Sequence, residues 1–177
     1  MDWIDTVNRF WFEELEPKDW FGSSSDLDAT IRERFANLHA ALEHQPPDPD
    51  SLRPEGHVAA VIVFDQFSRN LFRGLAETYA TDDIAQALAI HAVDHGLDTT
   101  LSTQQRQFLY MPFMHSEDRA MQARSVQLFR AIEIADSLRY AEHHKAIVDR
   151  FGRFPHRNEI LGRTTTEAER AFLKTDY

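Results

Sequence analysis

Apolar residues recur along most of the chain at the three- and four-residue spacing of an α-helix. The spacing predicts helices over residues 2–15, 26–43, 54–73, 82–95, 103–112, 117–135, 138–151 and 167–174. The alternating pattern of a half-buried strand is absent, and so are the Asn-Gly and Asp-Gly pairs typical of hairpin turns. We therefore expect an all-helical protein of about eight helices, forming a single domain over residues 1–177.

Residues that commonly begin or end helices lie at the edges of these segments. Ser102 and Thr166 each precede a glutamine or glutamate by three residues, which is the pattern of a capping box. Ser116 and Ser137 are interpreted as N-caps of the helices that follow them. Pro112 is interpreted as the end of the helix before it, because proline lacks the backbone N–H that a helix interior needs.

The segment 57–73 combines a strongly apolar half with a polar half. Residues 58–64 are apolar all round, which predicts a central, enclosed helix. Asp65 and Arg69 follow four residues apart, so they can pair on one face of that helix, and Gln66 and Asn70 have the same spacing. Either a structural ion pair or the floor of a ligand cleft would explain charges at this position.

Positive charge is concentrated in one segment near the C-terminus. Residues 139–163 carry six bases and three acids, a net of +3, in a chain whose net charge is −10. Five of the six bases are arginine, the residue suited to bidentate contacts with carboxylate or phosphate. The irregular stretch 153–158 therefore predicts an anion receptor, although arginines can also cap the carbonyls of neighbouring helices.

Composition narrows the classes of function. The 177 residues include no cysteine, which excludes disulfides, thiolate nucleophiles and cysteine-ligated metals. An excess of 29 acids over 19 bases disfavours binding to nucleic acids or anionic membranes. No secretory signal or run long enough to span a membrane is present, so we expect a cytoplasmic protein. His91 and His95 have ligand spacing but no third partner, and no glycine-rich phosphate loop occurs, so neither metal nor cofactor is expected.

Three motifs make the chain recognisable as a whole. They are FDQFSRN at residues 64–70, RQFLYMPF followed by HSE within residues 106–117, and RFGRFPHRN at residues 150–158. With these motifs the chain resembles a bacterial family known only as a domain of unknown function, within the tetratricopeptide-repeat-like (TPR-like) superfamily. The resemblance covers essentially the whole chain and implies a TPR-like stack of antiparallel helix pairs. It implies no reaction.

The first functional hypothesis is a small-molecule site, which could be enzymatic, formed where the polar motifs meet. It would bind a small anion, a carboxylate or phosphate, through arginine. His115 or His156 would act as general acid or base, oriented by Asp65 or Glu117. The expected ligand-binding residues are Gln66, Arg69, Asn70, Arg73, Tyr110, His144, Arg153, Arg157 and Asn158.

The second hypothesis is a TPR-like scaffold whose arginines bind an acidic peptide or a C-terminal carboxylate. The polar motifs could equally form a buried network that only holds the helices together. The aromatic segment with Trp3 and Phe10 to Phe12 could pack on its own core or on a second subunit, so a homo-oligomer is compatible with the sequence.

Overall fold

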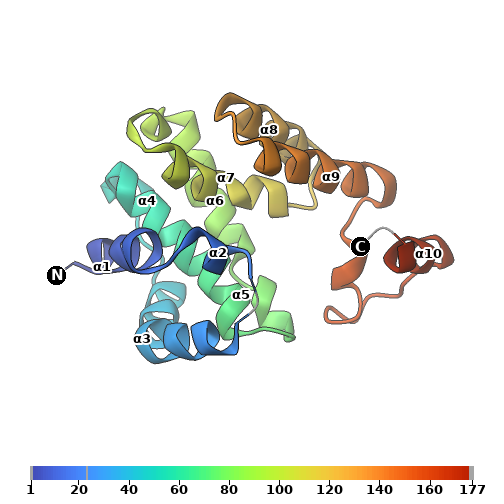
Figure 1. The fold of residues 1–177 in the computed structure, drawn as a ribbon, viewed down its shortest axis with the longest axis horizontal. Helices are drawn as coiled ribbons and strands as arrows, with labels where there is room; N and C mark the ends of the chain where they lie inside the picture. Colours follow the sequence, from blue (N-terminus) through green and yellow to red (C-terminus); the bar gives the residue numbers. More distant parts are fainter. Residues whose placement is uncertain (1, 23, 176–177) are drawn as a thin grey trace.

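The structure, a computed structural model, describes residues 2–22 and 24–175, and within them every regular element is a helix (Figure 1). The α-helices are α1 (Trp3–Arg9), α2 (Pro17–Trp20), α3 (Ser25–His44), α4 (Pro54–Val61), α5 (Ser68–Leu71), α6 (Asp82–Asp94), α7 (Thr103–His115), α8 (Arg119–Ala131), α9 (Ala135–Phe151) and α10 (Glu167–Thr175). Short 3-10 turns are η2 (Pro49–Ser51), η4 (Ala76–Tyr79), η5 (Leu97–Thr100) and η6 (Pro155–Arg157). The all-helical prediction is confirmed. None of the helices in the described ranges is long and apolar enough to cross a membrane.

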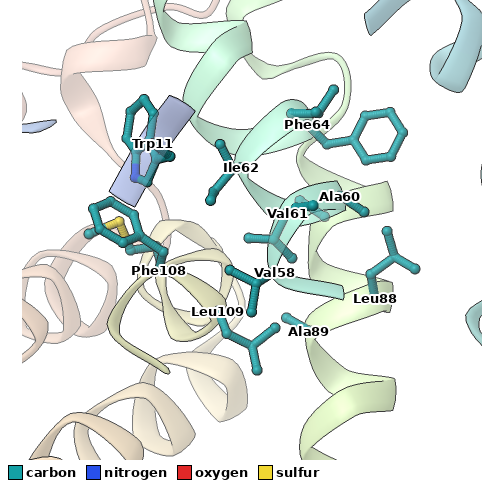
Figure 2. Close-up of a cluster of buried hydrophobic side chains, with 14 of the residues drawn as sticks. Trp11, Val58, Ala60, Val61, Ile62, Phe64, Leu88, Ala89, Phe108 and Leu109 are labelled. Atoms are coloured by element: carbon teal, nitrogen blue, oxygen red, sulfur yellow. The ribbon is translucent and has the colours of Figure 1, made fainter. Parts of the chain in front are cut away.

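The helix α4 lies at the centre of the main hydrophobic core. Residues 58–64 have no exposed surface, as their apolar pattern predicts. Figure 2 shows their side chains meeting Leu88 and Ala89 of α6 and Phe108 and Leu109 of α7. Burying this much apolar surface is the main stabilising contribution of the fold, and it places the polar end of the segment deep in the protein.

A second, smaller core lies at the C-terminal end of the chain. Ile147 and Val148 of α9 pack there with Phe154 and with Phe172 of α10. In Figure 1 this region, coloured orange to red, extends away from the body formed by α1 to α7. The segment that carries η6 therefore has its own apolar anchor.

Two predicted α-helices contain π-helical turns. The predicted helix 2–15 consists of α1 followed by the π-helix η1 (Phe10–Glu14). The predicted helix 54–73 consists of α4, the π-helix η3 (Ile62–Phe67) and α5. A π-turn bonds each N–H to the carbonyl five residues back, so it rotates later residues away from regular α-helical positions. Arg73 lies beyond α5, which ends at Leu71.

The predicted boundary at Pro112 is wrong. The helix α7 continues through Pro112 to His115, in a segment whose side chains from Gln107 to Met114 are buried. Ser116 is the C-cap of α7, and α8 is capped by Asp118, whose carboxylate accepts hydrogen bonds from two backbone N–H groups. Tertiary packing outweighs the one helical hydrogen bond that proline removes.

The predicted boundary between the helices 117–135 and 138–151 is also displaced. The helix α8 ends at Ala131, and Glu133 has a φ of 57°, a left-handed conformation that ends a helix although the residue is not glycine. The helix α9 begins at Ala135, so Ser137 is not its N-cap but a buried residue whose hydroxyl accepts a hydrogen bond from Gln107. The capping boxes at Ser102 and Thr166 are confirmed.

Candidate functional site

A cleft of about 190 Å³ lies where the start of α6, the turn η4, the end of α7 and the turn η6 meet. Its lining combines acidic side chains with one histidine and one arginine. The lining residues are Asp65, Tyr79, Asp82, Asp83, Gln86, Pro112, His115, Ser116, Glu117 and Arg157. Four of the residues predicted from the sequence therefore share one cleft, and they come from three motifs that are far apart in the chain.

The floor of the cleft is Asp65, whose side chain is only 1% exposed. Its carboxylate accepts hydrogen bonds from Nδ1 of His115 at 2.7 Å, from Arg69 at 3.1 Å and from Gln66 at 2.5 Å. Asp65 lies within the π-helix η3, a kind of turn that occurs often at functional sites. Burial alone would raise the pKa of Asp65, but the nearby His115 and Arg69 outweigh it and hold that pKa well below its usual range.

The contact with Asp65 determines which tautomer His115 adopts when the ring is neutral. A carboxylate only accepts hydrogen bonds, so Nδ1 of His115 carries the proton in the 2.7 Å contact. The opposite nitrogen, Nε2, then holds the lone pair, and the described residues supply no hydrogen bond to it. Since the ring lines the cleft, this is the arrangement of a histidine base positioned by a buried carboxylate.

Two arginines are joined by a second carboxylate, Asp82 at the start of α6. Arg69 donates to both carboxylate oxygens of Asp82, at 2.7 and 3.2 Å, and to the carbonyl of Thr78 at 2.7 Å. Arg157 reaches the same carboxylate at 3.5 Å and donates to the carbonyl of His115 at 2.9 Å. Burial raises the pKa of Asp82, and the neighbouring Asp65 carboxylate adds to that effect against the opposing arginines.

Arg157 also lies against two aromatic rings. Its guanidinium lies 4.4 Å from the ring centre of Tyr79 and 4.7 Å from that of Phe154. Its Nε is buried without a hydrogen-bond partner among the described residues, and burial lowers the pKa of this arginine. A guanidinium fixed by stacking, with donors still unused, is suited to a planar anion.

Two further histidines lie behind the cleft, beside Phe154. Burial lowers the pKa of His144 to about 4, with a further contribution from the nearby His115. Burial and then the charge of Arg157 lower the pKa of His156 to about 4. Both rings are therefore neutral near pH 7, and both contact Phe154 of the small C-terminal core.

Glu117 attaches the C-terminal segment to the rest of the site. Its two carboxylate oxygens accept hydrogen bonds from Arg163 at 2.7 and 3.0 Å, and one also accepts the backbone N–H of Phe154 at 2.7 Å. Arg163 in turn donates to Asn158 at 3.0 Å. Glu117 is thus committed to holding the segment that delivers Arg157, and burial, which would raise its pKa, is outweighed by these donors.

Not every predicted site residue lines the cleft. Arg69 and Gln66 lie behind it and bind Asp65, while Asn158 binds Arg163. The others form contacts away from the lining. These are Asn70 and Arg73 with Asp28, Tyr110 with Asp98, and Arg153 with Glu169. The sequence-based expectation of one pocket that gathers all of these side chains is therefore too broad.

Four lining residues, Tyr79, Asp82, Asp83 and Gln86, were not predicted from the sequence. They belong to one stretch around the start of α6, where acids in a first turn are usually explained by the helix dipole. Arg163 was visible only as a member of the arginine-rich segment. No pattern in the sequence shows that the α6 start faces His115.

The described residues contain no group of three or more histidine, aspartate or glutamate side chains able to hold a metal ion. The cleft itself combines the imidazole of His115, the buried carboxylate of Asp65 that accepts a hydrogen bond from it, and the guanidinium of Arg157.

Three comparisons relate the chain to other proteins. Residues 7–176 match the model of a family described as "Bacterial protein of unknown function (DUF924)". The chain is similar to a solved structure of a protein of unknown function, ATU0120 from Agrobacterium tumefaciens, with 39% identity and a TM-score of 0.91. That match covers 97% of this chain and 96% of the other. The comparison with curated proteins finds no match. The chain therefore belongs to the DUF924 family of bacterial proteins.

Proposed function

We propose that the cleft binds a small anionic ligand at Arg157 and that His115, positioned by Asp65, moves a proton to or from that ligand. The observation that carries the proposal is the 2.7 Å contact between a cleft-lining imidazole and a carboxylate that is almost completely buried. A histidine held in this way presents a defined lone pair to the cleft, and a defined lone pair is what general acid–base chemistry requires.

The charges in and behind the cleft support a ligand with a single anionic group. Asp65, Asp82 and Glu117 each already accept hydrogen bonds from at least one guanidinium. Arg157, the arginine in the lining, has one short hydrogen bond, to the carbonyl of His115, and only a 3.5 Å contact with Asp82, so it is the group with capacity for an added anion. Drug-sized ligands occupy roughly 300–1,000 Å³, so the smaller cleft favours a metabolite of a few heavy atoms over a peptide.

Isothermal titration calorimetry with inorganic phosphate, acetate and succinate tests the binding half of the proposal. We expect one of these anions to bind the wild-type protein, and Arg157→Gln to weaken that binding by about tenfold or more because a charge-assisted contact is lost. Arg139→Gln is the matched control, since Arg139 is an exposed arginine on α9. Equal affinity in Arg157→Gln and the wild type would contradict the proposal.

The proton-transfer half is tested by ¹⁵N NMR of the histidine rings. In spectra recorded at about pH 9, we expect the neutral His115 ring to carry its proton on Nδ1. We expect Asp65→Asn to abolish this preference, because an amide can also donate to the ring. A wild-type ring protonated on Nε2 would rule out His115 as the base facing the cleft.

A further inference from the structure

Three successive carbonyl groups at the end of α7 are each held by a side chain from another element. The side-chain nitrogen of Gln122, on α8, donates to the carbonyls of Met114 and Ser116, at 2.6 Å in each case. Arg157 donates to the carbonyl of His115 between them, at 2.9 Å. The backbone on both sides of the histidine is therefore fixed by one amide group.

The surroundings of Gln122 determine how its amide is oriented. Its side chain is completely buried, and both nearby carbonyls are acceptors, so the nitrogen and not the oxygen must face them. The oxygen, Oε1, is then buried without a hydrogen-bond partner in the described part of the chain. The amide is therefore committed through its nitrogen to the two carbonyls.

Capping of the helix end does not account for the whole arrangement. The carbonyl of Met114 belongs to the last turn of α7, where carbonyls lack helical partners. Ser116 lies beyond the last helical residue, and Gln122 reaches it at the same 2.6 Å. What the two carbonyls have in common is that they flank His115.

We infer that Gln122 is a positioning residue that acts through the backbone to hold the His115 ring against Asp65. The inference rests on the proposed function, in which that contact sets the lone pair facing the cleft. Catalytic groups must be held to within roughly 0.5 Å of their productive positions. One amide that bonds the residues on both sides of His115 restrains the backbone of the histidine from both directions. Gln122 itself does not line the cleft.

The test compares Gln122→Met with Gln127→Met, a matched change at an exposed position of the same helix. Histidine-ring ¹⁵N spectra at about pH 9 report the His115 tautomer. In Gln122→Met we expect the single Nδ1–H form to become a mixture of both tautomers and the Nδ1 proton resonance to shift away from its hydrogen-bonded position. Gln127→Met should match the wild type. A purely structural glutamine would lower the melting temperature and leave the tautomer unchanged.

The outcomes separate this inference from the proposed function. A Gln122→Met spectrum identical to that of the wild type would overturn the positioning role alone, because the proton would still be on Nδ1. A wild-type ring protonated on Nε2 would overturn the proposed base and the positioning role with it. If the methionine variant does not fold, Gln122→Glu retains the side-chain shape, replaces the donor with an oxygen, and is expected to change the tautomer in the same direction.

Discussion

Two contacts between a histidine and an aspartate look alike by distance but lie in different surroundings. Nδ1 of His115 is 2.7 Å from Asp65, and Nε2 of His91 is 3.0 Å from Asp50. The Asp65 side chain is 1% exposed, whereas that of Asp50 is 84% exposed. A buried carboxylate exerts a strong field in a medium of low polarity, and an exposed one is screened by water.

The neighbours of the two contacts differ as well. Asp65 is also bound by Arg69, so its position is fixed from several sides. His91 instead stacks with two other histidines, with ring centres 5.3 Å from His57 and 4.1 Å from His95. The comparison shows that contact distance alone does not distinguish the two histidines, whereas the burial of the carboxylate and its other partners do.

The largest effect that tests this difference is expected from Asp65→Asn. Removing the charge leaves Arg69 with Asp82 as its remaining carboxylate and leaves His115 with none, and breaking a buried ion pair from one side costs about 3–5 kcal/mol. Asp50→Asn should cost less than about 1 kcal/mol, because an exposed ion pair contributes little. Urea unfolding curves of both variants measure the two costs. Comparable losses would show that burial does not distinguish the two contacts.

A smaller effect concerns the dependence of stability on pH. The pKa of His144 is lowered to about 4, below the ordinary value of roughly 6.5 that applies in the unfolded chain. As the pH falls between these values the unfolded state binds the proton first, so the free energy of unfolding decreases. In His144→Gln, the free energy of unfolding should fall by roughly 1–3 kcal/mol less than in the wild type between pH 7 and about pH 4.

The control for that experiment is His143→Gln, at an exposed position next to His144, which should change the pH profile much less because His143 makes only a small contribution to the lowered pKa of His144. His57→Gln extends the test to the histidine stack, because burial lowers the pKa of His57 in the same direction. Urea midpoints from pH 7 to about pH 4 provide the profile. Parallel profiles for His144→Gln and the wild type would contradict the expectation.

The smallest effect is the coupling between Asp50 and His91. A double-mutant cycle with Asp50→Asn and His91→Gln should give a coupling free energy of about 0.5 kcal/mol or less. At about 1 M salt, where the screening length is roughly 3 Å, this coupling should approach zero. The coupling between Asp65 and Arg69 should persist at the same salt concentration, because both side chains are largely shielded from solvent.

Much of the fold and part of the site could be predicted from the sequence. The helical segments, the central position of residues 58–64 and the pairing of Asp65 with Arg69 all follow from interactions within a few residues along one helix. The boundary at Pro112 was wrong, because a local rule was overridden by packing on both sides of α7. The TPR-like arrangement of helix pairs stays a prediction of the resemblance.

The helices, the apolar centre and the three polar motifs follow from spacing along the chain, because that spacing is repeated in every helical turn. Which polar residues meet depends on how the helices pack together. The contact between Asp65 and His115 joins positions 50 residues apart, and it depends on the π-turn in η3 and on how α7 packs beside it. Contacts of this kind depend on the relative placement of whole elements, which no short stretch of sequence encodes.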